Sequence, residues 1–286
     1  MRQAIGMDIG GTGVKAARVD ADGRILAHTS EPTGKSASAV IAQVDAMIAA
    51  LDHTSVCAIG IGVPSRVNTK TGTVFPGGYV DLSGPPLKQR LANVRGRPVF
   101  TGNDGAMALL AEARLGAARG RADAIMLTIG TGIGGAVMLQ GKIWHGRATA
   151  GQLGHITVVH DGVVCACGRR GCLETVSSGT ALGRHIAEAG LPATTRAEDL
   201  VARPDPASRD VIERWIAPLR SGIDSLVATV DPDIIVLGGG LGQVAAGALE
   251  RFPATSSWFQ CKVVPAALGG EAGVVGAALA ALEAMP

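Results

Sequence analysis

Two segments of this chain, 120 residues apart, share one pattern: an apolar run, a turn rich in Gly and Thr, and a second apolar run. The first is IGMDIGGTGVKAARV at Ile5–Val19, and the second is IMLTIGTGIGGAVML at Ile125–Leu139; the two align without a gap. Two buried strands joined by such a turn need glycine for positive φ and for close approach of the backbones. The pattern therefore predicts two similar hairpins, one in each half of the chain.

The turns of these hairpins are candidates for binding phosphate. Turns of this composition present several backbone N–H groups, which can form a nest for phosphate oxygens. A third glycine turn, LGGGLG at Leu237–Gly242, follows an apolar run and precedes a helical pattern, a place where α/β folds contact phosphates or nucleotides. None of the three fits the Walker or the Rossmann pattern. The alternative is a set of ordinary turns in a glycine-rich protein, but their order and spacing favour a polyphosphate held between two halves.

Short runs rich in Ile and Val alternate with longer Ala-rich stretches along the chain, which predicts the α/β class. We expect strands at Ala4–Ile9, Val14–Val19, Cys57–Ile61, Val99–Thr101, Ala124–Ile129, Gly135–Leu139 and Ile234–Leu237. We expect helices at Ser36–Leu51, Asp104–Gly116, Ser177–Ala189, Ser208–Val230, Gln243–Arg251 and Gly273–Glu283.

Size and composition exclude several classes of protein. With 286 residues, 47% of them hydrophobic and 17% charged, the chain can bury one large core or two modest ones. The net charge of +2, without a long basic run, does not indicate a basic surface that would bind nucleic acid. The sequence shows no secretory signal pattern and no run of 18 or more apolar residues. We therefore expect a cytoplasmic protein without nucleic-acid or membrane partners.

The segment from His155 to Cys172 predicts a zinc site. Cys165, Cys167 and Cys172 lie within CACGRRGC, and His155 precedes them by ten residues. Three thiolates and one imidazole suit a tetrahedral Cys3His site, which has no open position for catalysis, so we expect the zinc to be structural. Gly168 and Gly171 would let the chain turn tightly around the ion. The alternative, free cysteines in a core, fits poorly with three cysteines so close to glycine and arginine.

The segment TGND at Thr101–Asp104 lies where a predicted strand ends and a predicted helix begins. Asn103 or Asp104 would cap that helix, and capping alone is one explanation of the pair. The functional explanation is that Asp104 accepts the proton of a hydroxyl as its oxygen attacks a terminal phosphoryl group. We expect the helix N-terminus to keep this carboxylate ionised.

Four motifs together resemble the ROK family, which comprises bacterial glucokinases, fructokinases, N-acetylhexosamine kinases and related sugar-responsive repressors. They are DIGGTGVK at Asp8–Lys15, TIGTGIGG at Thr128–Gly135, GQLGH at Gly151–His155 and CACGRRGCLE at Cys165–Glu174. The likeness covers essentially the whole chain, in the family's motif order. It implies an actin-like (ribonuclease-H-like) duplicated fold with a catalytic cleft between two lobes. The small lobe would contain residues 1–102 and about 273–286, and the large lobe residues 103–272.

The resemblance also implies roles for individual residues. Asp104 would be the general base, and Asp8 would approach Mg²⁺ through water. Phosphate or nucleotide contacts would come from Asp8, Gly10, Gly11, Thr12, Lys15, Gly130, Thr131, Gly132, Gly134, Gly239 and Gly240. Sugar contacts would come from Gly77, Gly78, Asn103, Asp104, Gln152, His155 and Glu174. His155 would also bind the zinc ion.

Three departures from the family pattern lie on the sugar side. Gln152 stands where the family usually has Glu, and Gly102 stands where Glu commonly precedes the Asn-Asp pair. The loop Phe75–Leu87 lacks the family's Asn–Leu–x–Trp pattern. These departures leave the phosphoryl chemistry untouched, but they bear on which sugar is bound.

We therefore predict a kinase dependent on ATP and Mg²⁺ that phosphorylates a hexose, at the 6-position of a glucose-like or N-acetylated sugar, and that forms a homodimer. Three alternatives remain: a sugar-sensing regulator of the same family, a sugar-binding protein without turnover, and a glucokinase that uses polyphosphate. The regulators carry an N-terminal helix-turn-helix that this sequence does not show, and no tract lined by Lys and Arg indicates a polyphosphate donor.

Overall fold

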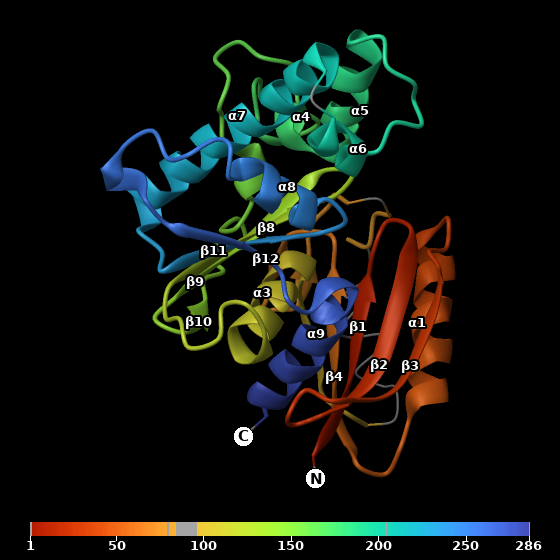
Figure 1. Ribbon diagram of the computed structural model, residues 1–286. Helices are drawn as coiled ribbons and strands as arrows, with labels where there is room; N and C mark the ends of the chain where they lie inside the picture. Colours follow the sequence, from red (N-terminus) through yellow and green to blue (C-terminus); the bar gives the residue numbers. More distant parts are fainter. Residues whose placement is uncertain (1, 79, 84–95, 204, 286) are drawn as a thin grey trace. The chain divides into compact units, whose positions relative to one another are not determined.

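The computed structural model describes residues 2–78, 80–83, 96–203 and 205–285 (Figure 1). The chain divides into two compact units. The first contains Met1–Gly120, Ile143–Ala150 and Gly270–Pro286, and the second contains Arg121–Lys142 and Gly151–Gly269. This division differs from the predicted boundary after residue 102. The helix that begins at Asp104 belongs to the first unit because it packs on the C-terminal helix of that unit.

The first unit is built on a five-stranded sheet with the order β3-β2-β1-β4-β7. β1, β2 and β3 are antiparallel neighbours, whereas β4 runs parallel to both β1 and β7. The strands are β1 (Gln3–Ile9), β2 (Gly13–Asp20), β3 (Ile25–Pro32), β4 (Val56–Val63) and β7 (Val99–Asn103). A separate antiparallel pair joins β5 (Val67–Asn68) and β6 (Thr73–Val74).

The second unit repeats this order in a sheet with the strands β10-β9-β8-β11-β12. β8 and β9 are antiparallel, and β11 runs parallel to both β8 and β12. The strands are β8 (Ala124–Ile129), β9 (Ile133–Leu139), β10 (Lys142–Ile143), β11 (Ile234–Gly238) and β12 (Lys262–Pro265). The two hairpins predicted from the sequence thus occupy the same place in two sheets of one strand order, as a duplicated fold requires.

The two hairpins differ in register by one residue. Ile9 pairs with Val14 across residues 10–13, whereas Ile129 pairs with Ile133 across residues 130–132. The gapless alignment of the two segments is therefore wrong after the turn. A shift of one residue changes which face of the sheet each side chain occupies.

Helices cover both faces of the first sheet (Figure 1). Ile and Met side chains of β1 and β4 pack under α1 (Ala37–Leu51). The opposite face of these strands carries Gly and Ala, and α9 (Ala272–Glu283) packs on it together with α3 (Asp104–Leu115). A Cβ at Gly6 or Gly60 would collide with the backbone of α9. Glycine at these two positions is what allows the helix backbone to lie directly on the strands.

The second unit has a larger core beneath helices α4 to α8. Their bounds are α4 (Glu174–Ser177), α5 (Gly179–Glu188), α6 (Ala197–Ala202), α7 (Pro206–Val230) and α8 (Gly242–Leu249). Trp215 of α7 is fully buried, and its indole N–H donates to the carbonyl of Ser177 at 2.8 Å. Ser177 Oγ donates in return to the carbonyl of Trp215 at 2.8 Å, so the pair fixes α4 on α7.

Each predicted strand and helix overlaps an observed one, with one correction. The helix predicted at Ser177–Ala189 is α5, which begins two residues later, because Ser178 has an extended conformation after α4 and caps α5 by accepting from the N–H of Ala181. The strands β3, β5, β6, β10 and β12 and the short helices α4 and α6 were not predicted. Among the described residues, no helix is both long and apolar enough to cross a bilayer.

Candidate active site and metal centre

The turn of the first hairpin, Gly10–Gly13, is held from outside through its carbonyl groups. Thr33 Oγ1 donates to the carbonyl of Gly10 at 2.6 Å, and the N–H of Thr33 donates to the carbonyl of Thr12 at 3.3 Å. Within the described residues, the N–H groups of Gly11 and Thr12 have no hydrogen-bond partner. Two neighbouring free N–H groups in a fixed turn form a nest that can accept an anion.

Asp8 is the second-last residue of β1, beside this turn, and pairs with Lys15 across the hairpin. Lys15 Nζ donates to the carbonyl of Gly270 at 2.7 Å and lies 3.8 Å from a carboxylate oxygen of Glu271. Gly273, in the first turn of α9, lies so close to Asp8 that a Cβ there would be 2.5 Å from its Oδ2. Burial raises the pKa of Asp8 to about 6, and the nearby charge of Lys15 opposes that rise.

Asp104 is the first residue of α3, directly after β7. Asn103, not Asp104, is the N-cap, since its Oδ1 accepts from the N–H of Ala106 at 3.2 Å. The carboxylate of Asp104 accepts from the N–H of Gly105 at 2.7 Å and from Nδ2 of Asn103 at 2.9 Å. Capping therefore does not explain why an acid follows Asn103.

The prediction that the helix N-terminus keeps Asp104 ionised needs correction. Burial, followed by the neighbouring charge of Asp8, raises the pKa of Asp104 to about 7. The hydrogen bonds from Gly105 and Asn103 lower this pKa, but by less. Loss of hydration thus outweighs the helix terminus, and Asp104 exchanges its proton near neutral pH.

Ser65 connects the Asn-Asp pair to the loop after β6, which the sequence analysis did not foresee. Nδ2 of Asn103 donates to the carbonyl of Ser65 at 3.3 Å, and Ser65 Oγ donates to the carbonyl of Gly77 at 2.8 Å. Gly78 has φ of 81°, and a Cβ there would lie 2.5 Å from the carbonyl oxygen of Pro64. The structure thus brings Gly77 and Gly78 to Asn103. Tyr79 and residues 84–87 of the loop Phe75–Leu87 lie outside the described residues.

The turn of the second hairpin, residues 130–132, is held in the same way as the first. The N–H of Gly179 donates to the carbonyl of Gly130 at 2.7 Å. Thr180 donates to the carbonyl of Thr131 through its N–H at 3.3 Å and its Oγ1 at 2.8 Å. The break between α4 and α5 makes these contacts possible, because it directs the start of α5 at the turn. The N–H groups of Thr131 and Gly132 find no partner in the part of the chain that the structure describes.

The third glycine turn, between β11 and α8, packs on the end of β8. The N–H of Leu241 donates to the carbonyl of Ile129 at 3.0 Å. Gly239 has φ of 77°, and any Cβ there would collide with the backbone of Ile129. Gly239 and Gly240 are exposed. The structure thus brings these two glycines to the Gly130–Gly134 segment within the second unit.

The donor atoms of His155, Cys165, Cys167 and Cys172 all lie within 4.8 Å of one another. Cys165 Sγ is 3.5 Å from His155 Nδ1, and Cys167 Sγ is 3.6 Å from Cys172 Sγ. Four ligands around a tetrahedral zinc ion, at about 2.3 Å for sulfur and 2.0–2.1 Å for nitrogen, would be separated by roughly 3.5–3.8 Å. The cluster therefore fits zinc.

The thiol of Cys172 is buried within the cluster. Burial, followed by the neighbouring thiols, raises the pKa of Cys172 to about 12. Its thiolate at neutral pH therefore requires a cation beside it.

The loop that carries the cysteines is closed by tight backbone contacts. Gly171 has φ of 68°, and a Cβ there would collide with the carbonyl of Val159. Arg169, which the prediction did not assign, donates to the carbonyl of His155 at 3.1 Å and to Thr157 Oγ1 at 2.9 Å, closing the loop.

Gln152 lies just before the metal-binding segment in the sequence, and Glu174 lies just after it. Gln152 precedes the single turn of 3-10 helix η1 (Leu153–His155), which packs on β9: a Cβ at Gly154 would collide with the carbonyl of Ile133. The side chain of Gln152 is partly buried. Glu174 opens α4, and its Oε2 accepts from the N–H of Ile133 at 3.0 Å. No pattern in the sequence indicated this last contact.

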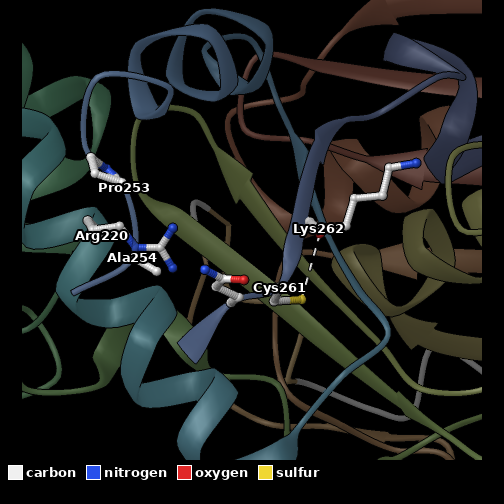
Figure 2. Close-up of a pocket in the computed structure, with 6 residues that line it drawn as sticks. Arg220, Pro253, Ala254, Cys261 and Lys262 are labelled. Atoms are coloured by element: carbon white, nitrogen blue, oxygen red, sulfur yellow. Dashed lines mark hydrogen bonds between the residues drawn. The ribbon is translucent and has the colours of Figure 1, made fainter. Parts of the chain in front are cut away.

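A pocket of about 490 Å³ lies elsewhere in the second unit (Figure 2). Its lining residues are Arg220, Pro253, Ala254, Gln260, Cys261 and Lys262, none of which belongs to the predicted site. Lys262 pairs with Ile234 at the start of β11, whereas Gly238 ends that strand next to the third glycine turn. The pocket is therefore at the opposite end of the sheet from the candidate nucleotide contacts.

Comparisons with known proteins show similarity over nearly the whole chain. The chain is 33% identical to a glucokinase of Streptomyces coelicolor over 322 aligned positions, which cover 100% of this chain and 99% of that one. It is 31% identical to an N-acetylmannosamine kinase of Yersinia pseudotuberculosis, with 98% of each chain covered. A crystal structure of a ROK family glucokinase from Streptomyces griseus, in complex with glucose and AMPPNP, superposes with a TM-score of 0.84 at 32% identity, covering 98% of this chain and 99% of that one.

These likenesses confirm the predicted α/β class and the duplicated, actin-like fold. The family model for ROK proteins matches residues 4–284, nearly the whole sequence. This protein belongs to the ROK family.

Proposed function

We propose that this protein transfers the terminal phosphoryl group of ATP to the 6-hydroxyl of a glucose-like or N-acetylated hexose. The class of sugar kinase follows from full-length relatives named glucokinase and N-acetylmannosamine kinase. The observation that carries the finer proposal is the carboxylate of Asp104, whose pKa is raised to about 7 at the start of α3. A base is most effective when its pKa lies near the working pH.

In the proposed reaction, the sugar hydroxyl oxygen attacks the terminal phosphorus of ATP while its proton passes to Asp104. The new P–O bond forms as the bond from that phosphorus to the bridging oxygen breaks, and ADP leaves with the electron pair. Phosphoryl transfer asks the protein mainly for positioning and for neutralisation of charge. Asn103 contributes to positioning, because it caps α3 and donates a hydrogen bond to Asp104.

The two hairpin turns would hold the phosphates. Thr33 holds two carbonyl groups of the first turn, and Gly179 and Thr180 hold two of the second. Each turn leaves two central N–H groups free among the described residues. This arrangement supports phosphate contacts at Gly10, Gly11, Thr12, Gly130, Thr131, Gly132 and Gly134, and nucleotide contacts at Gly239 and Gly240. Lys15 would add a positive charge, while it keeps its hydrogen bond to Gly270.

Asp8 is the residue that would hold Mg²⁺, through bound water. It lies near the end of β1, beside the first turn, and its charge raises the pKa of Asp104. Magnesium prefers oxygen ligands and keeps several of its waters when it binds a nucleotide. The ion would neutralise charge on the phosphates when bound.

The Cys3His cluster would hold a structural zinc ion. Its four protein ligands leave no position for a substrate, so the ion would fix the loop and take no part in proton transfer. Gln152, His155 and Glu174 are attached to that loop or lie next to it. They are the proposed sugar contacts of the second unit, with Gly77, Gly78 and Asn103 as those of the first. We also propose a homodimer.

A coupled assay of ADP release across a panel of hexoses tests the proposal. We expect turnover that depends on ATP, on Mg²⁺ and on a glucose-like or N-acetylated hexose. Sugar binding without turnover would instead indicate the non-catalytic regulator or binding protein. Turnover with polyphosphate but not with ATP would indicate the polyphosphate-dependent glucokinase. Size-exclusion chromatography with light scattering tests the homodimer.

A further inference from the structure

Glu174 connects two parts of the second unit that are far apart in the sequence. Its Oε2 accepts a hydrogen bond of 3.0 Å from the N–H of Ile133, which follows the second glycine turn. Its Oε1 lies 3.8 Å from Sγ of Cys165, one of the predicted zinc ligands. A single carboxylate therefore bridges the cysteine loop and the turn that we assign to phosphate.

The sequence of the turn is adapted to this carboxylate. A Cβ at Gly132 would collide with Oε2 of Glu174 and would lie 3.2 Å from its Cδ. Only glycine lets the carboxylate reach past residue 132 to the N–H of Ile133. Gly132 thus has a role beyond the flexibility that a tight turn requires.

Glu174 completes the support of the turn on the side of β9. Gly179 and Thr180 hold the carbonyl groups of Gly130 and Thr131, and Glu174 holds the N–H of Ile133. Fixing both ends of the turn restricts the directions of the two N–H groups between them. Donors that are already in place lose little entropy when an anion binds.

We propose that Glu174 is a positioning residue for the nucleotide: it fixes the turn at residues 130–133 so that the N–H groups of Thr131 and Gly132 are ready for phosphate. This inference rests on the proposed function, which assigns phosphate binding to this turn, and it is separate from any contact of Glu174 with sugar. It also makes nucleotide affinity depend on the loop that carries the zinc ligands.

Substitutions that remove the charge of Glu174 can distinguish this positioning role from a general structural role. A carboxylate beside a phosphate site repels the phosphate, while its hydrogen bond to the N–H of Ile133 holds the turn. Glu174→Gln keeps an acceptor oxygen and removes the repulsion. Glu174→Ala removes both. The two variants should therefore differ in nucleotide affinity, although both lose the charge.

The test is the dissociation constant of AMPPNP with Mg²⁺, measured by calorimetry without sugar so that sugar contacts do not contribute. We expect Glu174→Ala to bind about 5- to 20-fold more weakly than the wild type. Glu174→Gln should bind within about twofold of the wild type or more tightly. The matched control, Thr229→Val, removes a side-chain hydrogen bond within α7, to the carbonyl of Ser225, and it should bind like the wild type. Equal weakening by Ala and Gln, or an unchanged constant for Ala, overturns the proposal.

Hydrogen exchange at the amide of Ile133 keeps the test independent of the proposed function. We expect this amide to exchange at least about tenfold faster in Glu174→Ala and in Gly132→Ala, which displaces the carboxylate without altering a residue of the cysteine loop. Unchanged exchange in both variants refutes the anchoring role, whatever the protein binds. Wild-type protein that fails to bind AMPPNP refutes the proposed function instead.

Discussion

The side-chain amide of Asn103 donates a hydrogen bond of 2.9 Å to Oδ1 of Asp104, the residue that follows it. Asn103 also caps α3, so one residue performs the structural task and orients the acid beside it. The acid is thereby free to act on a substrate. This division of tasks supports Asp104 as the base and leads to the first prediction.

Asp104→Asn should lower kcat by roughly 10²–10⁴-fold, the usual contribution of a general base. The substituted amide keeps an acceptor oxygen for the N–H of Gly105, so the helix start and the sugar affinity should change little. Steady-state kinetics and sugar titration measure the two effects separately. A kcat within about threefold of the wild type would contradict the assignment.

The raised pKa values of Asp8 and Asp104 predict a stability that falls as pH rises. Both carboxyls bind protons more tightly in the folded chain, with pKa values of about 6 and 7, than at the ordinary value of 3.8. Between about pH 4 and pH 7 the folded state therefore holds more protons than the unfolded state, and the free energy of unfolding decreases with pH. Asp104→Asn should remove part of this slope and be more stable than the wild type at pH 8, by about 1–3 kcal/mol. Urea denaturation at pH 5 and pH 8 measures the difference; equal slopes for both proteins would rule out the buried acid as its source.

Purified protein should contain one zinc ion per chain, and Cys167→Ser should lose it. Activity should fall as well, because Gln152, His155 and Glu174 depend on the loop for their placement. Mass spectrometry of the native protein and metal analysis give the stoichiometry. Cys261→Ser is the control, since Cys261 lies outside the cluster and its thiol donates a hydrogen bond to the carbonyl of Pro232. Folded, active wild-type protein without zinc would eliminate the site.

Gln152→Glu should change the order in which sugars are preferred. A carboxylate accepts hydrogen bonds from two hydroxyls, whereas an amide offers one acceptor and one donor group. Restoring the acid should strengthen binding of glucose by about 1 kcal/mol, several-fold in affinity, and disfavour sugars with a carbonyl or acyl oxygen at that place. The measurement is kcat/KM across glucose, mannose, fructose, allose, N-acetylglucosamine and N-acetylmannosamine. Identical ranking, with ratios within about twofold, would mean that Gln152 does not set specificity.

Gly60→Ala should destabilise the first unit by about 1–3 kcal/mol or more, because its Cβ would collide with the backbone of Ala277 in α9. Gly183→Ala is the matched control. Gly183 lies within α5 with no atom near the position of a Cβ, so the same substitution should stabilise the protein by about 0.5–1 kcal/mol. Thermal unfolding of both variants provides the comparison. Similar melting temperatures for the two would contradict the close packing of α9.

How well each feature could be predicted from the sequence depended on how far apart in the chain its residues lie. The Cys3His cluster and the two hairpins were predictable because their residues lie within short segments with strong chemical or apolar patterns. The register difference between the hairpins was not predictable, since the repeated Gly and Thr residues align equally well with and without a gap. The strand β12 was missed because it has four residues and its partner β11 begins 28 residues earlier. The hydrogen bond from Ile133 to Glu174 spans 41 residues, and no local pattern could indicate it.

The packing of α9 on β1 and β4 also sets an order of events during synthesis. The ribosome completes residues 272–283 only after the whole second unit has been made, and until then the Gly and Ala face of the first sheet lacks α9. The second unit, residues 121–142 and 151–269, can close its own core before that helix emerges. The part of the chain that is translated first is thus finished last. Because Gly273 lies against Asp8 and the carbonyl of Gly270 accepts from Lys15, the surroundings of these two residues are completed only at this final step.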